Sequence, residues 1–277
     1  MDYKVVKIFN NNVIHAKEDK KEMILIGKGI GFSKKPGDLL PADSKIIEKI
    51  FHESNSNYSI EYLEMIPQYK KEIIGVSEEI IAKAEDILGP LSPNIHAALV
   101  DHISFALDRI KMGLPIENPF IDEIIILYPE EYEVAELAAS LIMERLDVEI
   151  GEDEKGFITL HLHSAKTNKS IRQTMQDTRI YKTCMDLVAD SIGQVYDDND
   201  YIHYNFILSL KLIVHSSSKG NKISNPIKGE IKNRLVESYK IANDIASLFA
   251  KEKNIVLNED MIAYIAMDIE KIRQIKI

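Results

Sequence analysis

Amide, glycine and aromatic side chains crowd the first 32 residues of this chain in a mixture suited to ligand binding. Three consecutive asparagines, Asn10-Asn11-Asn12, are followed by the run Gly27-Lys28-Gly29-Ile30-Gly31-Phe32. Amides offer donors and acceptors, glycines let a backbone approach a ligand closely, a phenylalanine ring can stack on a base, and lysines contact phosphates. The combination favours a folded polynucleotide over a small metabolite.

The charge of this segment differs in sign from that of the whole chain. The net charge is −10, yet the first fifty residues hold ten lysines against seven acidic residues, which leaves them near +3 and the remainder near −13. Attraction of phosphate depends on the local field, so an acidic protein with a mildly basic face remains compatible with RNA. The alternative is that the lysine pairs at 20–21 and 34–35 are solvated turn charges.

A second group of reactive side chains emerges from an internal repeat. A shift of 107 positions superimposes the same residues without a gap. The matching pairs are Asn118-Pro119 with Asn225-Pro226, Glu123-Ile124 with Glu230-Ile231, Tyr132 with Tyr239, Ala135 with Ala242, and Glu152-Asp153 with Glu259-Asp260. Each copy spans about a hundred residues of helical periodicity, and two copies predict two tandem helical bundles rather than a solenoid.

The two copies differ at histidines. His102 of the first copy corresponds to Ser209 of the second, and His161 corresponds to Asp268. A single histidine on an apolar helix is usually a hydrogen-bonded core residue. Two histidines that are replaced together in the sister copy indicate a paired role that one copy keeps.

Phosphoryl acceptance is the chemistry that best fits this histidine pair. Imidazole can bind a metal, transfer protons or carry a phosphoryl group. A metal site is disfavoured because His161 and His163 point to opposite sides of a helix and no cysteine or carboxylate cluster completes a ligand set. Acid–base catalysis is disfavoured because no nucleophile elbow, phosphate loop or zinc motif accompanies the pair. We therefore expect no enzyme, no metal and no cofactor.

Length, cysteine content and hydropathy bound the class of protein. The 277 residues, 45% hydrophobic, suit two or three domains with real cores. The single cysteine, Cys184, excludes an internal disulfide and fits a reducing compartment. We find neither a signal peptide nor an apolar run of membrane-spanning length, and we expect a soluble cytoplasmic protein.

The elements that must position these residues are strands at first and helices later. Alternating polarity predicts strands at residues 3–9, 12–16, 22–27 and roughly 30–34, forming a small antiparallel sheet that needs a partner surface. From about residue 44 the spacing of Ile46, Ile47, Ile50 and Phe51 predicts helix. Residues 52–57 are polar and predict a linker.

The expected fold class is therefore multi-domain α+β. A small antiparallel sheet that binds RNA, residues 1–57, precedes two all-α helical bundles, residues 65–170 and 171–277. An Asn-Pro pair breaks each bundle near its middle, and the seam between them is expected near residues 168–175.

These motifs resemble those of the BglG-type transcriptional antiterminators, in which a co-antiterminator (CAT) RNA-binding domain precedes two phosphotransferase regulation domains (PRDs). The resemblance covers essentially the whole chain. It rests on Asn10-Asn11-Asn12-Val13, Gly27-Lys28-Gly29-Ile30-Gly31-Phe32, Asp101-His102-Ile103, Asn118-Pro119-Phe120, Tyr128-Pro129-Glu130-Glu131-Tyr132 and Gly156-Phe157-Ile158-Thr159-Leu160-His161. The glycine-rich run looks most similar to that of the glucose-type branch.

The resemblance implies a mechanism and a set of partners. The RNA-binding domain dimerises and grips a hairpin in the leader of a sugar-utilisation messenger, which prevents an overlapping terminator from forming. Positions that match the family's RNA face are Lys7, Asn10, Asn12, Gly27, Lys28, Gly29 and Phe32. In the family, the sugar permease (EIIB) phosphorylates the first PRD and inhibits, whereas the carrier protein HPr phosphorylates the second and activates.

Only the first PRD keeps the family's phosphorylation pattern. His102 and His161 match its two positions, whereas Ser209 and Asp268 stand where the second PRD should have histidines. This departure puts direct activation by HPr in doubt. Asp268 could imitate a phosphorylated histidine, or the second PRD could serve only as a dimerisation scaffold.

Two other classes of protein compete with this interpretation. A DNA-binding activator that carries PRDs would need a helix-turn-helix or ATPase module, and residues 1–55 predict strands and turns instead. An enzyme or metal-dependent sensor built on helical bundles would need the catalytic constellation that the sequence lacks.

Overall fold

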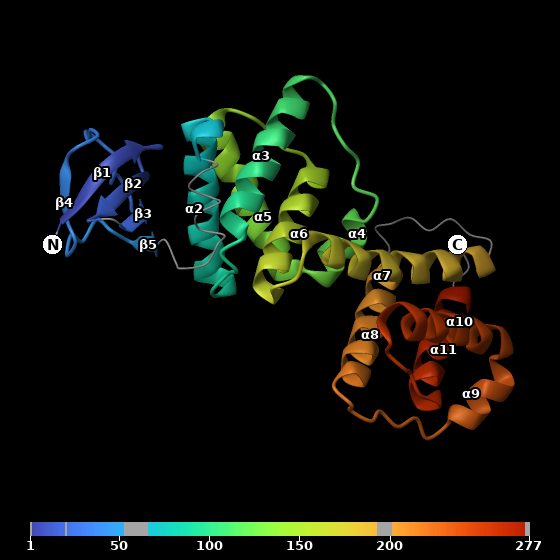
Figure 1. Ribbon diagram of the computed structural model, residues 1–277. Coiled ribbons are helices and arrows are strands. Elements are labelled where there is room, and N and C mark those ends of the chain that lie inside the picture. The colour runs from blue at the N-terminus through green and yellow to red at the C-terminus, as the bar shows by residue number, and fades with distance from the viewer. Residues whose placement is uncertain (1, 20, 53–65, 193–200, 275–277) are drawn as a thin grey trace. The chain divides into compact units, whose positions relative to one another are not determined.

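The computed structural model describes residues 2–19, 21–52, 66–192 and 201–274. They form a β-sheet followed by helices, and Figure 1 shows this order along the chain. The chain divides into two compact units. The first contains residues 1–119 and 128–174, and the second contains residues 120–127 and 175–277.

The first element is a five-stranded antiparallel sheet with the strand order β4-β1-β2-β3-β5. Its strands are β1 (Asp2–Ile8), β2 (Val13–Glu18), β3 (Lys21–Ile26), β4 (Leu39–Pro41) and β5 (Lys49–His52). The register pairs Val13 with Ile26 across β2 and β3. The small antiparallel sheet followed by helices confirms the predicted fold class.

Two local expectations are wrong, and a third falls mostly on residues that the structure does not describe. Residues 30–34 form turns rather than a strand, because Gly29 and Ser33 adopt the positive φ angles of 75° and 59° that end a strand. The helix expected from residue 44 is instead a turn and strand β5, because residues 49–52 pair with β3 and this pairing overrides the helical spacing of the apolar residues. Most of the expected linker, residues 53–57, lies outside the described residues.

The sheet is covered on both faces. One face forms a core of Tyr3, Val5, Ile14, Ala16, Met23 and Leu25, which is closed by Ile30 of a loop and Leu40 of β4. On the other face Phe9, Val13, Ile24 and Ile26 join the core of the first helical bundle, which includes Ile74 and Ile81 of helix α2. The partner surface that a small sheet needs is therefore supplied by the chain itself.

The first helical copy follows a short 3-10 helix, η1 (Ile66–Gln68). It consists of α2 (Lys71–Leu88), α3 (Ile95–Lys111), α4 (Ile121–Leu127), α5 (Pro129–Leu146) and α6 (Glu152–Thr167). Helix α5 begins with Pro129, whose fixed φ suits the first turn, and α6 is followed by Asn168 in the left-handed conformation.

The second helical copy consists of α7 (Ile171–Ile192), α8 (Tyr201–Ser218), α9 (Lys228–Arg234), α10 (Val236–Lys253) and α11 (Glu259–Gln274). Helix α4 of the first copy belongs to the second compact unit, although it lies between α3 and α5 in the sequence. There Lys211 of α8 donates to the carbonyl of Leu127 at 2.6 Å, and Glu123 lies 3.7 Å from the buried His203.

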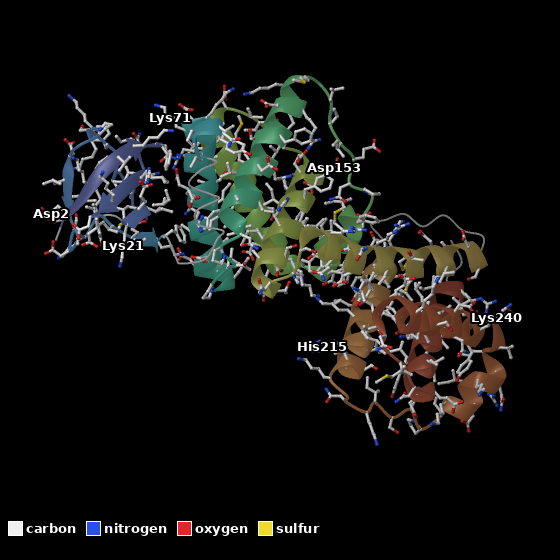
Figure 2. All side chains as sticks on the ribbon, viewed as in Figure 1. Asp2, Lys21, Lys71, Asp153, His215 and Lys240 are labelled. Atoms are coloured by element: carbon white, nitrogen blue, oxygen red, sulfur yellow. The ribbon has the colours of Figure 1, made fainter. Side chains whose placement is uncertain are left out.

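The helix bounds confirm the internal repeat. Helices α9, α10 and α11 begin 107 residues after α4, α5 and α6. The backbone N–H of Asn118 donates to Asp153, which Figure 2 labels, at 2.7 Å. The N–H of Asn225 donates to Asp260 at 2.9 Å in the second copy. In both copies the Asn-Pro pair thus interrupts the helices, and a carboxylate on the last helix of the copy binds the asparagine N–H.

Candidate nucleic-acid interface and histidine site

Two loops meet at one edge of the sheet and carry most of the predicted RNA face. Because β1, β2 and β3 are antiparallel, the end of β1, the start of β2 and the end of β3 lie side by side. The loop at 9–12 therefore contacts the loop at 27–34. The N–H of Gly31 donates to the carbonyl of Asn11 at 2.9 Å, and the N–H of Gly27 donates to that of Asn12 at 3.0 Å.

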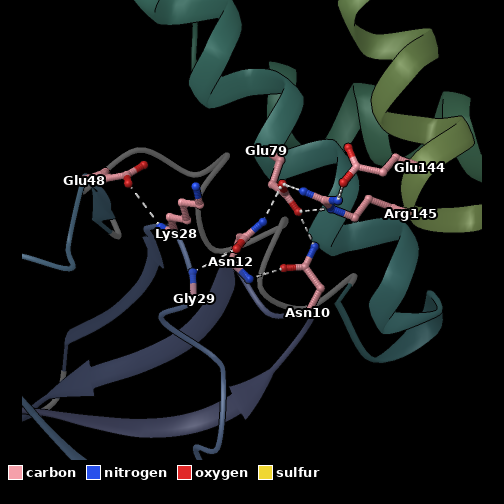
Figure 3. Close-up of polar contacts among 8 residues, drawn as sticks. All are labelled: Asn10, Asn12, Lys28, Gly29, Glu48, Glu79, Glu144 and Arg145. Atoms are coloured by element: carbon pink, nitrogen blue, oxygen red, sulfur yellow. Dashed lines mark hydrogen bonds and ion pairs between the residues drawn. The ribbon is translucent and has the colours of Figure 1, made fainter.

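The side chains of Asn10 and Asn12 hold these loops in shape. The Asn10 Oδ1 accepts the N–H of Asn12 at 2.8 Å, and the Asn12 Oδ1 accepts the N–H of Gly29 at 2.9 Å. Figure 3 shows the resulting chain of contacts from one loop to the other. Both carboxamide oxygens are therefore used within the fold, which leaves the NH₂ groups as the outward-facing donors.

Two glycines of this site have structural reasons to be glycine. Gly29 has a φ of 75°, the left-handed region that costs side chains with a Cβ more than it costs glycine. A Cβ on Gly27 would lie 1.7 Å from the carbonyl oxygen of Ile46. The close approach at Gly27 is thus to the protein's own backbone, so this residue shapes the site rather than opening it to a ligand.

The aromatic and cationic members of the set lie around these loops. Phe32 is 69% exposed, so its ring is no part of the core of this chain. Lys28 is exposed, and its backbone N–H donates to Glu48 at 3.2 Å. The Lys7 ammonium lies 5.6 Å from the centre of the Phe9 ring. An exposed ring and an exposed lysine in the same loop are what stacking on a base and contact with phosphate require.

The predicted histidine pair is brought together by two neighbouring helices. His102 lies on α3 and His161 on α6, and the centres of their rings are 4.9 Å apart. His163 lies on the other side of α6, where its Nδ1 is 3.0 Å from Glu131 and its ring centre lies 4.0 Å from that of the tilted Tyr128 ring. The two histidines of α6 thus lie on different sides of the helix, as their spacing of two residues predicts.

A buried acid and a buried guanidinium complete the pair. The His102 Nε2 lies 3.3 Å from Glu154 Oε2, and Arg109 donates to Glu154 Oε1 at 2.7 Å. The side chains of Glu154 and Arg109 are only 6% and 11% exposed. Burial raises the pKa of the Glu154 carboxyl, but His102 and Arg109 outweigh this effect and hold that pKa below its usual value.

The imidazole of His161 stays neutral, so one of its two ring nitrogens carries no proton. Burial disfavours its charged form and the neighbouring His102 repels it, which together lower the pKa of His161 from 6.5 to about 3. At neutral pH the imidazole is therefore neutral. A neutral ring nitrogen is the nucleophile that phosphoryl transfer to histidine requires.

The second copy has a different polar cluster at the same place. The Ser209 hydroxyl donates to Asp268 at 2.5 Å, and Lys271 donates to the other carboxylate oxygen at 2.7 Å. Met261 and Ser216 stand where the repeat places Glu154 and Arg109 of the first copy. The second copy has thus lost all four polar groups of the histidine site.

Several residues of these sites escaped the sequence reasoning. Glu154 and Arg109 could have been found, because the same shift of 107 that exposed the histidines also replaces both of them. No pattern in the sequence pointed to Glu79, which accepts hydrogen bonds from Asn10 at 2.6 Å and from Asn12 at 3.0 Å. Within the described ranges no cluster of ligands could hold a metal ion, and no helix is long and apolar enough to cross a membrane.

The fold and the two sites define a class: a small nucleic-acid-binding sheet joined to a duplicated helical regulation module. The description "CAT RNA binding domain" matches residues 3–59, and "PRD domain" matches residues 78–165 and 182–272. The chain belongs to the BglG-type transcriptional antiterminators, as its motifs led us to expect.

Three relatives match the chain over nearly their full length, and two of them are named antiterminators. The chain is 29% identical to the transcription antiterminator LicT of Bacillus subtilis over 274 residues, which is 97% of this chain and 98% of that protein. It is 28% identical to the beta-glucoside operon antiterminator of Dickeya chrysanthemi over 275 residues, 98% and 96% of the two chains. It is also 28% identical to the GlcT protein of Staphylococcus haemolyticus over 278 residues, 97% and 95%.

A solved structure supports the N-terminal architecture. The crystal structure of GlcT CAT-PRDI is 36% identical and aligns with a TM-score of 0.50, covering 61% of this chain and 100% of that one. The likeness to GlcT proteins also fits the glucose-type form of the glycine-rich run. The chain is a transcription antiterminator by family, and its relatives are regulators rather than enzymes.

Proposed function

We propose that this antiterminator binds a hairpin in a leader messenger as a homodimer and thereby prevents a terminator hairpin from forming. The observation that carries the proposal is the exposed ring of Phe32 beside the paired Asn10–Asn12 and Gly27–Gly29 loops. In this proposal Lys7, Asn10, Asn12, Gly27, Lys28, Gly29 and Phe32 form the RNA face. Phe32 stacks on an unpaired base, the lysines contact phosphates, and the amides read base edges.

Phosphorylation of His102 and His161 is the proposed control. A phosphoryl group adds between one and two negative charges at neutral pH. At this site the new charge would face the buried Glu154 carboxylate across the ring of His102, so like-charge repulsion and the need for solvation would disturb the packing of α3 on α6. The proposed donor is the sugar permease (EIIB), and the proposed effect is weakened dimerisation and RNA binding.

The second PRD is proposed to act without phosphorylation at its two matching positions. Ser209 and Asp268 offer no imidazole there, so direct phosphorylation of these positions by HPr does not take place in this proposal. The carboxylate of Asp268, held by Ser209 and Lys271, carries one negative charge in the place of a phosphohistidine. Either this charge holds an active arrangement or the domain is a scaffold for the dimer.

The domain division and the location of the protein complete the proposal. We take residues 1–57 as the RNA-binding domain and residues 65–170 and 171–277 as the two PRDs. Action on a nascent messenger and exchange of phosphoryl groups with the phosphotransferase system both favour the cytoplasm.

The test is RNA binding by the full-length chain. The probe is a hairpin enriched by this chain from a pool of randomised internal-loop hairpins, with the DNA duplex of the same sequence as competitor. Phe32→Ala should weaken binding by about 1–3 kcal/mol, the usual range for loss of a stacked base. Leu39→Ala is the matched control, because Leu39 is an exposed apolar residue of the same sheet, at 58%, outside the two loops.

The second arm uses the same hairpin with protein phosphorylated by the permease. Phosphorylated wild-type chain should bind less tightly, and His102→Ala/His161→Ala should neither accept phosphate nor change its affinity. Equal affinity for duplex DNA would favour a DNA-binding activator, and an unchanged Phe32→Ala would contradict the proposed RNA face. Phosphate on the double variant would contradict the histidine assignment.

A further inference from the structure

Helix α2 places a carboxylate on the donors of the proposed RNA face. Glu79 Oε1 accepts the Nδ2 of Asn10 at 2.6 Å, and Glu79 Oε2 accepts the Nδ2 of Asn12 at 3.0 Å. Figure 3 shows Glu79 between the two asparagines on one side and Arg145 on the other. These two NH₂ groups are the parts of the asparagines that face away from the loops, because their carboxamide oxygens bind within them.

A carboxylate in this position resembles the groups that RNA would bring. It offers two acceptor oxygens to the asparagine NH₂ groups, as base edges would, and its negative charge makes these hydrogen bonds stronger than those to a neutral acceptor. We propose that Glu79 is a built-in competitor for RNA: in the free protein it occupies Asn10 and Asn12, and RNA must displace it to bind. This inference rests on the proposed RNA face.

Arg145 of α5 makes the exchange feasible. Its Nε and Nη2 donate to the two Glu79 oxygens at 3.2 and 3.0 Å, and its Nη1 pairs with Glu144. The Glu79 side chain is 7% exposed, and a buried carboxylate without a partner would be costly. Because the guanidinium stays bound when the amides leave, Glu79 keeps a cation in both states. RNA therefore has to replace only the two hydrogen bonds between Glu79 and the asparagines, and the ion pair between Glu79 and Arg145 stays intact.

The backbone of α2 is close enough to keep this contact in place. A Cβ on Gly75 would lie 2.5 Å from the Asn10 Nδ2, so a glycine at this position lets α2 approach the asparagine loop. At the other end of the interface the Lys49 ammonium donates to the carbonyl of Ala82 at 2.6 Å and pairs with Asp86 at 2.9 Å. The sheet and α2 also share apolar packing at Phe9, Val13, Ile24 and Ile26.

The experiment compares two single-charge variants in the full-length chain. Glu79→Gln keeps the shape, but its amide nitrogen faces a second donor, so at least one bond to the asparagines is lost and the other loses its charge. Glu144→Gln is the matched control, because it removes the same charge from the same guanidinium without touching Asn10 or Asn12. We expect Glu79→Gln to bind the enriched hairpin about tenfold more tightly, and Glu144→Gln to stay within about twofold of wild type.

A second readout does not depend on RNA. The N–H groups of Asn12 and Gly29 are held by the side chains that Glu79 restrains, so their hydrogen exchange in the free protein should accelerate in Glu79→Gln and not in Glu144→Gln. A folded Glu79→Gln with wild-type affinity would overturn the proposal, as would equal gains in both variants. Asn12→Ala separates the two hypotheses. If it binds the hairpin as wild type does, the RNA face itself is wrong, whereas loss of binding with an unchanged Glu79→Gln refutes the competitor alone.

Discussion

The ion pair between Arg109 and Glu154 beside the histidine site gives a stability prediction, because the second copy shows the same positions without the charges. Arg109 is held by Glu154 at 2.7 Å, and within the described chain its Nε and Nη1 are buried without a hydrogen-bond partner. The second copy has methionine and serine at these two positions, Met261 and Ser216, within the same helix packing. The sister copy therefore shows which uncharged pair this site of the fold accepts.

We expect Glu154→Met to destabilise the first unit by about 3–5 kcal/mol, because removing one partner leaves the buried guanidinium uncompensated. The side chains of the pair are 6% and 11% exposed, so water cannot replace the lost partner without opening the bundle. Glu154→Met/Arg109→Ser removes both charges and should recover most of this loss. The coupling free energy between the two positions should then be at least about 2 kcal/mol.

Hydrogen exchange of α3 and α6 as a function of urea measures this free energy locally. A local probe is needed because the chain contains two compact units, and a single melting curve would mix their transitions. Peptides from α10 serve as an internal control, since they should not respond. A Glu154→Met cost below about 1 kcal/mol would refute the reasoning, and so would a double variant as unstable as the sum of the single ones.

Two further predictions concern the histidine site and its counterpart. Because the pKa of His161 is about 3 in the folded protein and 6.5 in the unfolded chain, the unfolded state binds a proton that the folded state excludes. Stability of the first unit should therefore fall as the pH drops from 6.5 to 3, by up to about 1.4 kcal/mol per pH unit. His161→Gln should flatten this slope in urea titrations, and parallel curves would contradict the shift. Asp268→Asn keeps the bond from Ser209 and removes the charge, so it should lower antitermination in cells that lack HPr; unchanged activity would leave the second PRD a scaffold.

Periodicity and repetition made much of the fold predictable. Alternation located β1, β2 and β3 to within a few residues, and the shift of 107 predicted the two helical copies that follow. Residues 30–34 could not be read this way, because their turns depend on the positive φ of Gly29 and Ser33 rather than on polarity. The helix expected over residues 46–51 was wrong because the spacing of their apolar residues fits a helix, whereas the pairing of residues 49–52 with β3 is a contact that this spacing does not encode.

The sites were predictable only as far as each motif lay close in sequence or was repeated. The Asn10–Asn12 and Gly27–Phe32 motifs are local, and the repeat identified His102 and His161. Glu79 reaches the asparagines from a helix about 70 positions further along the chain, and Arg145 binds Glu79 from a helix about 135 positions beyond the asparagines. Their contacts follow from the packing of α2 on the sheet, which no periodicity within one segment encodes.

The placement of helix α4 has a consequence for how the chain is made. Helix α4 ends at Leu127, but its buried residues Ile124, Ile126 and Leu127 belong to the unit that contains α8, which ends at Ser218. A ribosome that adds ~5–20 residues per second needs on the order of 5–20 s to make the intervening chain. During that interval the sheet and the helices α2, α3, α5 and α6 can fold, while the apolar side of α4 waits for its partner. The first helical copy is thus fully synthesised before it has finished folding. Its last folding step, the packing of α4, requires the second copy.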